Sequence, residues 1–270
     1  MNMRVAALQM TSSADVRANL AAAAELLEAA ARAGAVLAVL PENFAFMGLH
    51  DADKRKVAEG EGSGPIQDFL AGAARRLQLW IVGGTVPLQR APEERVAAAS
   101  LLFDSDGRRV ARYDKIHLFD VNIPGRQERY LESAHIAPGR EPVVVDTPVG
   151  KLGLTVCYDM RFPELFRRLS GAGAQLFSIP SAFTAPTGRA HWETLLRARA
   201  IENLCYVIAP AQAGIHQSGR ETYGDTLIVD YWGRVLGRKP RGQGIVVQDI
   251  DLARQAEARA SFPALDHRVM

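Results

Sequence analysis

The sequence predicts an α/β protein built from mixed sheets. Short apolar runs typical of buried strands alternate along the chain with longer amphipathic segments typical of helices. Antiparallel hairpins, each with turn residues between two strand-like runs, interrupt that alternation. The hairpins argue against a purely parallel sheet. We therefore expect α/β layers with one mixed sheet or with two sheets packed together.

The first half of the chain begins with a strand-like run over residues 4–10. We expect the helix that follows to be capped by Ser13 and to stop at Gly34, and the next helix to be capped near Ser63. Further expected elements are strands over 35–42 and 80–88 and a hairpin over 96–115. The long irregular stretch at 116–139 is of a kind that is often functional.

The second half repeats the theme. Two helices are expected, over residues 162–174 and 188–204. The strand-like segments are hairpins over 142–157 and 226–239 and single strands over 175–183, 205–214 and 244–251. A short helix and a tail should follow the last strand.

Composition indicates an ordinary globular domain. The chain has 270 residues, of which 48% are hydrophobic and 23% charged, and we find no Pro/Gly/Ser-rich linker. We therefore expect one domain over 1–270, with its core at about 1–252 and a C-terminal tail over 253–270. The net charge of +2 gives no reason to expect nucleic acid as a partner.

Cysteine usage and hydropathy suggest a compartment. Cys157 and Cys205 are too few for a disulfide framework or a paired-CxxC zinc site. No apolar run approaches the roughly 18 residues that span a bilayer, and the first residues do not predict a signal peptide. We expect a cytoplasmic protein with reduced thiols and no membrane partner.

Three reactive side chains stand at the carboxyl ends of predicted strands, where an open α/β sheet presents its ligand crevice. Glu42 ends "AVLAVLPE", Lys115 ends "RRVARYDK" and Cys157 ends "KLGLTVC", directly before a predicted helix. A helix N-terminus favours the thiolate form of a cysteine.

Ordinary structural roles fit the same three residues. A cysteine that ends an apolar run is more often a buried filler, as we interpret Cys205. A glutamate after a strand is usually its first solvated residue, and a single lysine usually lies on the surface. Spacing alone leaves both interpretations open.

Four segments together resemble the nitrilase superfamily of carbon–nitrogen hydrolases: "LPENF", "DKIHLFDVNIPG", "ESAHIAPG" and "VCYDMRFPEL". They occur in the order of that family, and the resemblance runs from the first strand to about residue 250. It implies a four-layer α-β-β-α sandwich of two mixed sheets with helices outside. It also implies a homodimer, with the tail from Ser261 packed across its interface.

The resemblance assigns roles to the strand-end residues. Glu42 is the expected general base, Lys115 the oxyanion-stabilising cation and Cys157 the nucleophile. Glu132 matches a second glutamate of the family and is expected to orient Lys115 and the substrate. We expect the backbone N–H of Tyr158 to be a further oxyanion donor. The implied reaction is hydrolysis of a non-peptide amide through a cysteine thioester, with release of ammonia.

The segment "SAFTAPTGRAHWETLLRARAIENLCYV" and the tail "FPALDHR" resemble the Nit1-type branch, whose activity is deaminated glutathione amidase. The omega-amidase branch, acting on α-ketoglutaramate-type substrates, shares several of the motifs and is the alternative. A small amide that bears carboxylates requires cations in the pocket. Arg161 is the first candidate, followed by Arg189 and Arg126, and His191 is a candidate lining residue.

Other classes of function have weaker signals. No GxSxG elbow marks a serine hydrolase, and the six histidines show no metal-ligand spacing, so we expect neither metal nor cofactor. An inactive binding or regulatory protein on a nitrilase-like scaffold is the alternative from another class. The intact Glu-Lys-Cys set argues against it.

Overall fold

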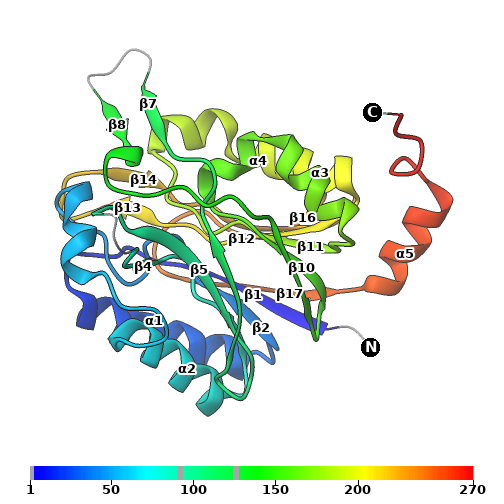
Figure 1. Ribbon diagram of the computed structural model, residues 1–270. Helices are drawn as coiled ribbons and strands as arrows, with labels where there is room; N and C mark the ends of the chain where they lie inside the picture. Colours follow the sequence, from blue (N-terminus) through cyan, green and yellow to red (C-terminus); the bar gives the residue numbers. More distant parts are fainter. Residues whose placement is uncertain (1–2, 91–93, 124–127, 270) are drawn as a thin grey trace.

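Two β-sheets face each other and helices cover their outer faces (Figure 1). This computed structural model describes residues 3–90, 94–123 and 128–269. Helices α1 and α2 contact the first sheet, and α3 and α4 contact the second. The four-layer α-β-β-α sandwich is therefore confirmed.

The first sheet has the strand order β17-β1-β2-β3-β5-β4, and β6 also pairs with β5. Its strands are β1 (Met3–Gln9), β2 (Leu37–Val39), β3 (Trp80–Val82), β4 (Val86–Leu88), β5 (Ala97–Phe103), β6 (Arg109–Asp114) and β17 (Gly244–Ile250). The central strands β1, β2 and β3 are parallel, with Ala7, Val39 and Val82 in register. The outer pairs are antiparallel.

The second sheet has the order β16-β15-β12-β11-β10-β9. Its strands are β9 (Val143–Thr147), β10 (Gly150–Leu154), β11 (Leu176–Ser178), β12 (Tyr206–Ala209), β15 (Thr226–Val229) and β16 (Val235–Lys239). Again three parallel strands form the centre, with Leu154, Ser178 and Ile208 in register, and antiparallel pairs flank them.

Side-chain alternation along the strands builds two cores. In β1, Val5 and Ala7 belong to the cluster between the sheets, whereas Ala6 and Leu8 belong to the cluster under the helices. Successive side chains of a strand point to opposite faces, so a strand buried on both sides needs apolar residues at every position. This is why the predicted central strands are continuous apolar runs.

The five α-helices are α1 (Val16–Arg32), α2 (Pro65–Leu77), α3 (Pro163–Gly171), α4 (Ala185–Asn203) and α5 (Leu252–Ser261). The predicted cap of α1, Ser13, is wrong, whereas α2 begins next to Ser63 as predicted but without a serine cap. The cap of α1 is Asp15, whose carboxylate accepts a hydrogen bond from Ala18 N at 3.1 Å. The cap of α2 is Gly64, and the buried carboxylate of Glu59 accepts from Ile66 N and Gln67 N instead of a serine. A local Ser signal cannot anticipate a distant carboxylate that serves the same N–H groups.

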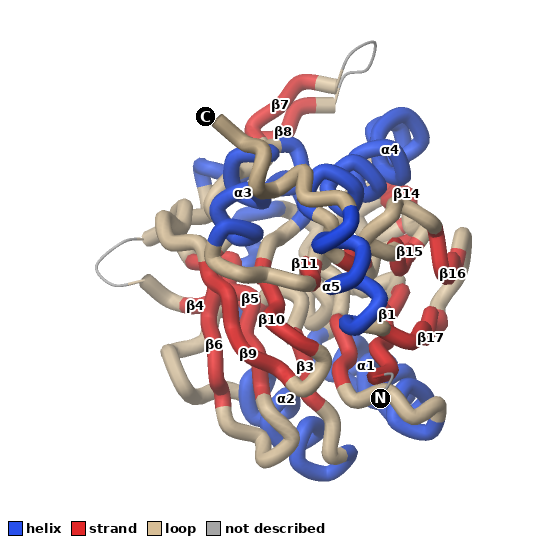
Figure 2. The backbone as a smooth tube through the Cα atoms, turned by 90° about the vertical axis from the view of Figure 1, so that its right-hand side faces the viewer, coloured by secondary structure: helices blue, strands red, loops and turns tan. Residues whose placement is uncertain are grey.

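The irregular regions carry smaller elements. These are 3₁₀ turns η1 (Asp51–Val57), η2 (Glu132–Ala134) and η3 (Cys157–Arg161), and the hairpins β7 (Asp120–Asn122) with β8 (Arg129–Leu131) and β13 (Ala213–Ile215) with β14 (Glu221–Tyr223). The β7–β8 arm projects beyond the body of the molecule in two perpendicular views (Figures 1 and 2). The expected strand over 80–88 is divided into β3 and β4, and 205–214 into β12 and β13.

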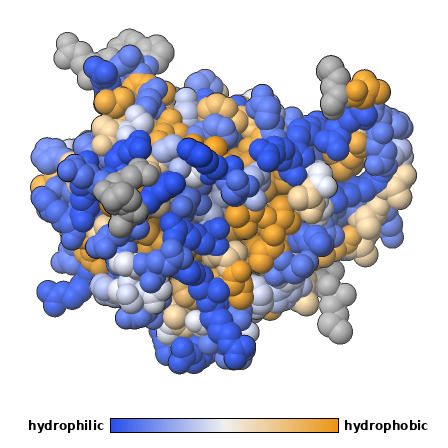
Figure 3. All heavy atoms as spheres, in the orientation of Figure 1, coloured by the Kyte–Doolittle hydropathy of each residue, from blue (hydrophilic) through white to orange (hydrophobic). Residues whose placement is uncertain are grey.

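The surface is mostly hydrophilic on the face that Figure 3 shows, with hydrophobic side chains gathered over the strands around β10. Among the described residues, no helix has both the length and the apolar character needed to cross a membrane.

Candidate active site

Residues that follow the carboxyl ends of strands in both sheets meet in one pocket. Glu42 lies three positions after Val39, which ends β2, and Cys157 lies three positions after Leu154, which ends β10. Lys115 directly follows β6. Together with Glu132 they line a cavity of about 480 Å³. The structure thus brings together the four residues that the sequence analysis singled out as catalytic.

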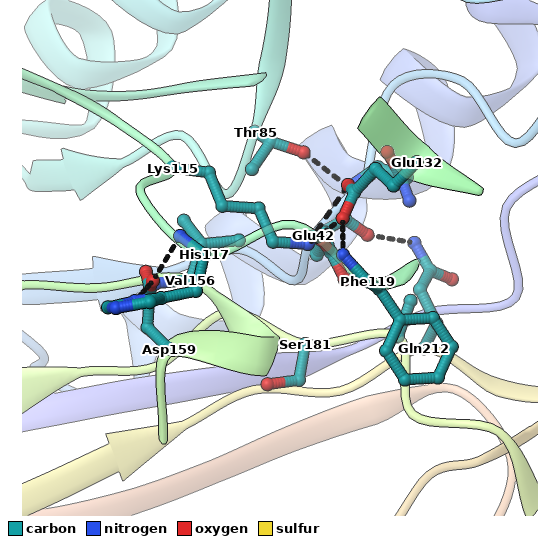
Figure 4. A network of polar contacts seen from close by, with 12 residues as sticks. Glu42, Thr85, Lys115, His117, Phe119, Glu132, Val156, Asp159, Ser181 and Gln212 are labelled. Atoms are coloured by element: carbon teal, nitrogen blue, oxygen red, sulfur yellow. Dashed lines mark hydrogen bonds and ion pairs between the residues drawn. The ribbon is translucent and has the colours of Figure 1, made fainter. Parts of the chain in front are cut away.

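Lys115 is clamped between two carboxylates (Figure 4). Its Nζ lies 2.8 Å from Glu42 Oε1 and 3.0 and 2.9 Å from the two carboxylate oxygens of Glu132, and the lysine is buried. Burial by itself would lower the pKa of Lys115, but the charges of Glu132 and Glu42 outweigh it and raise the pKa well above its usual value. The side chain is therefore a fixed ammonium.

Glu132 is held from two sides. Its Oε2 accepts a hydrogen bond from Phe119 N at 2.7 Å in addition to its contact with Lys115. Burial favours the neutral acid, but Lys115, and after it Lys54, hold the pKa of Glu132 below its usual value. Gly139 lets the loop that carries Glu132 approach the end of β6 closely. A Cβ at Gly139 would lie 2.0 Å from the carbonyl oxygen of Asp114, the residue before Lys115.

Glu42 is positioned through its backbone. Gln212 Nε2 donates to the carbonyl oxygen of Glu42 at 3.0 Å and to Ser12 Oγ at 2.8 Å. Gly84 packs against Pro41, the residue before Glu42; a Cβ at Gly84 would lie 2.0 Å from Pro41 O. These contacts fix the direction in which the glutamate leaves the first sheet.

Cys157 opens the η3 turn in a strained conformation. Its φ is +48°, a left-handed value rare for a residue with a side chain, and its N–H donates to Pro180 O at 2.9 Å. The prediction that a helix start lowers the pKa of this thiol is wrong. Burial first, and then the charge of Glu42, raise the pKa above its usual value, against the opposing effect of Lys115. The resting group is a thiol, because a five-residue 3₁₀ turn cannot offset burial.

Asp159 ties the turn of Cys157 to the segment of Lys115, and sequence reasoning missed it. Its fully buried carboxylate accepts hydrogen bonds from Val156 N at 2.8 Å, His117 N at 3.0 Å and Tyr113 Oη at 2.7 Å. The His117 ring lies 2.7 Å away through Nδ1 (Figure 4). The position of Asp159, two residues after Cys157 in "VCYD", was the available signal.

Aromatic side chains form much of the remaining wall. The lining residues beyond the four already described are Asn43, Asp51, Lys54, Phe119, Tyr130, Tyr158, Ala182, Phe183, Thr184, Thr187 and Arg220. Tyr158 contacts Phe119 edge-on, with the ring centroids 5.2 Å apart. Among the described residues, no cluster of three or more His, Cys, Asp or Glu side chains is arranged to hold a metal ion.

None of the predicted substrate-binding residues that the structure describes is among the residues that line this pocket. Arg161 lies over the rings of Phe183 and Tyr158, and its Nη atoms are 3.3 Å from His191 Nδ1. His191 is exposed, and Arg189 is exposed beside a different groove. Arg126 lies outside the described residues. The cations that line the pocket besides Lys115 are Lys54 and Arg220, and the sequence analysis found neither.

Comparison with known proteins agrees with this geometry. The sequence profile described as carbon-nitrogen hydrolase matches residues 4–260. A protein from Yersinia enterocolitica named deaminated glutathione amidase is 44% identical over 98% of this chain and 93% of its own length. The human protein of the same name is 43% identical over 98% of this chain and 81% of its own length.

A solved structure shares the fold closely. The NitFhit protein of Caenorhabditis elegans superposes with a TM-score of 0.93 at 40% identity over 99% of this chain. This chain spans 65% of that protein.

Proposed function

This chain belongs to the carbon-nitrogen hydrolase family and is a hydrolase that acts on amides, and on that premise we propose that it is a deaminated glutathione amidase with Cys157 as nucleophile. The relatives of that name, similar over nearly the whole chain, support the substrate. The observation that carries the catalytic part is the buried Glu42–Lys115–Glu132 clamp beside Cys157.

The first step is proton transfer from the thiol to Glu42. Because the pKa of Cys157 is raised, a resting thiolate cannot supply the reaction, and a base must act as the bond forms. Glu42 takes the proton while Sγ attacks the amide carbon, and the carbonyl π electrons move to oxygen.

The oxyanion forms next to fixed positive charge. Lys115 stays protonated because two carboxylates hold it in that form, so it opposes the developing charge without reorganising. The backbone N–H of Tyr158, a pocket residue, is the proposed second donor. Glu132 keeps Lys115 in place.

The C–N bond then breaks and Glu42 returns its proton to the leaving nitrogen. The leaving group depends on the amide. An unsubstituted amide such as α-ketoglutaramate releases ammonia, whereas the substituted amide of deaminated glutathione releases an amine. The expected release of ammonia therefore applies only to the alternative substrate. Water, deprotonated by Glu42, hydrolyses the Cys157 thioester through a second oxyanion and restores the thiol.

The proposal includes a homodimer in the cytoplasm. Three exposed hydrophobic side chains, Ile201, Trp232 and Phe262, support the dimer, because Trp232 and Phe262 are in edge contact and Ile201 borders the same turn. A reducing compartment suits a mechanism that needs a free thiol. Light scattering with Trp232→Glu as the variant measures the assembly state.

The deciding experiment compares kcat/KM for deaminated glutathione and α-ketoglutaramate, followed through the keto acid that both release. A large preference for deaminated glutathione is expected. The opposite preference leaves the chemistry standing and moves the substrate assignment to the omega-amidase branch. No turnover of either substrate by a folded protein favours a binding protein on this scaffold.

A further inference from the structure

Two cations in the pocket have no carboxylate within ion-pair distance among the described residues. Lys115 is paired with both Glu42 and Glu132, but Lys54 makes no hydrogen bond or ion pair with any residue that the structure describes. Arg220 likewise has no acidic partner among the described residues. Both line the same cavity as Cys157. Cations inside a concave site that have no carboxylate in direct contact are available to pair with an anion from solution.

Arg220 is held rigidly beside the nucleophile. Its Nη2 donates to Ala182 O at 3.0 Å, and the backbone N–H of the same Ala182 lies near the Cys157 thiol and lowers its pKa. The guanidinium carbon lies 4.9 Å from the ring centroid of Tyr130, on the β7–β8 arm. Arg220 and Cys157 therefore contact the same backbone residue, Ala182, one through its carbonyl oxygen and the other through its N–H.

The Nε of Arg220 is buried and has no hydrogen-bond partner. A buried polar atom without a partner is costly, and such atoms in native proteins commonly mark a site that something else completes. A guanidinium anchored by one nitrogen, with another donor unused, is suited to a carboxylate.

Lys54 reaches the pocket from a different segment, the η1 turn. Its charge helps to lower the pKa of Glu132, which shows that its field extends into the catalytic centre. Asp51, on the same turn, also lines the pocket but is exposed and makes no ion pair with Lys54. The lining as a whole carries three cations and three carboxylates, but two of the carboxylates are paired with Lys115 and the third, Asp51, is exposed.

The position of these residues matches the path of a long substrate. Asn43, Asp51, Lys54, Tyr130 and Arg220 line both the catalytic cavity and a wider open groove beside it. A ligand whose amide reaches Cys157 and whose other end extends into that groove therefore runs along a wall that includes Lys54 and Arg220.

We propose that Lys54 and Arg220 form a subsite that binds a carboxylate of the amide substrate and selects anionic over neutral amides. The inference rests on the proposed function for the identity of the substrate, but not for the existence of the anion site. Of the predicted arginines that the structure describes, it replaces Arg161 and Arg189 as residues that recognise substrate charge.

The first test measures selectivity. We compare kcat/KM for deaminated glutathione and for its dimethyl ester in the full-length wild type, Lys54→Met, Arg220→Gln and Lys56→Met. Lys56→Met is the matched control, because this variant removes the same charge from the same turn. Lys56 pairs with Asp53 and is not among the pocket residues. At least a tenfold loss of the acid-to-ester preference is expected in the first two variants, mainly through KM, and less than twofold in Lys56→Met.

The second test does not depend on turnover. Glutarate, a plain dicarboxylate, is used to protect Cys157 from iodoacetamide at 0.15 M salt, where screening confines charge effects to about 8 Å. The half-protecting concentration is expected to rise at least tenfold in Lys54→Met and in Arg220→Gln, and less than twofold in Lys56→Met.

The two proposals can then be separated. Protection that depends on Lys54 and Arg220, without hydrolysis of either amide, keeps the anion subsite and overturns the proposed amidase substrate. Absence of glutarate protection in the wild type, or equal protection in all four proteins, overturns the subsite. If Arg220→Gln fails to fold, Lys54→Met decides by the same criteria.

Discussion

The two cysteines lie at opposite ends of parallel strands in the same sheet. Cys157 follows the carboxyl end of β10, whereas Cys205 precedes β12, and these strands run parallel on either side of β11. Both side chains are almost fully buried. Burial raises the pKa of both thiols, that of Cys205 to about 12. Resting acidity therefore does not distinguish the candidate nucleophile from a buried filler.

Their neighbours differ in chemistry. Cys205 Sγ lies 3.2 Å from both Ala174 O and Asn203 O and 3.1 Å from Arg259 Nη2, and it lines none of the described pockets. Cys157 faces a cavity shared with a carboxylate and an ammonium. The comparison teaches that access and a nearby base, rather than a depressed pKa, distinguish the reactive thiol.

Exchanging each cysteine for alanine gives the largest contrast. Cys157→Ala is expected to abolish turnover and to form no acyl-enzyme, because no thioester can form. Cys205→Ala is expected to keep kcat within about threefold, because it is remote from the pocket. Intact-mass spectrometry after rapid quenching and steady-state assays measure both. Comparable losses in the two variants would break the comparison.

Lys115→Ala tests the role of the cation in the pocket of Cys157. Loss of one oxyanion donor typically costs about 10²–10³ in kcat, and we expect at least that decrease. Circular dichroism and the melting temperature check that the variant stays folded. Turnover near the wild-type value in folded protein would remove Lys115 from the mechanism.

Alkylation compares the two thiols in one molecule. At pH 7.5, Cys157 is expected to react with iodoacetamide at least about tenfold faster than Cys205, because the reagent must reach the sulfur and a base must take its proton. Peptide mapping gives the two rates. Removing the charge of Glu42 also removes one cause of the raised pKa of Cys157, but the loss of the base is expected to dominate. Glu42→Gln should therefore slow Cys157 alone, and a parallel slowing at Cys205 would indicate a global change instead.

The smallest expected effect concerns alkaline stability. Since the pKa of Cys205 is raised to about 12 in the folded state, the folded chain holds a proton that the unfolded chain releases above about pH 9. Stability falls as pH rises through that window, by roughly 1–2 kcal/mol between pH 9 and 10.5. Cys205→Ala should show a shallower decline in chemical denaturation over this range. An identical slope in both proteins would contradict the raised pKa.

The strand pattern was sufficient to single out the strand-end residues, and the resemblance was needed to assign their roles. Glu42 and Cys157 could be singled out because each follows a buried apolar run at its carboxyl end, where an open α/β sheet presents its ligand crevice. Glu132 needed the resemblance, because the loop that carries it has no periodic pattern. Lys54 and Arg220 had no signal, since one lies in a 3₁₀ turn and the other in a loop far along the chain.

The misplaced residues of α4 have a geometric explanation. The helix begins at Ala185, three residues before the predicted start, and Thr187 lines the pocket. Successive residues turn by about 100°, so Arg189 points about 200° from Thr187, nearly to the opposite side. His191 returns to the same face but one turn farther along, where Arg161 meets it. Arg189 and His191 were predicted from their chemical type and their segment rather than from a helix face, so their positions on α4 could not be anticipated.

The left-handed backbone conformation of Cys157 implies a conflict between catalytic activity and folding stability at this position. A side chain at a φ of +48° costs on the order of 1–2 kcal/mol that glycine would not incur. Selection to relieve this backbone strain alone would thus favour glycine, which cannot react. Retention of cysteine at such a site is a cost that only turnover can justify, and directed evolution without an activity screen would tend to erase it.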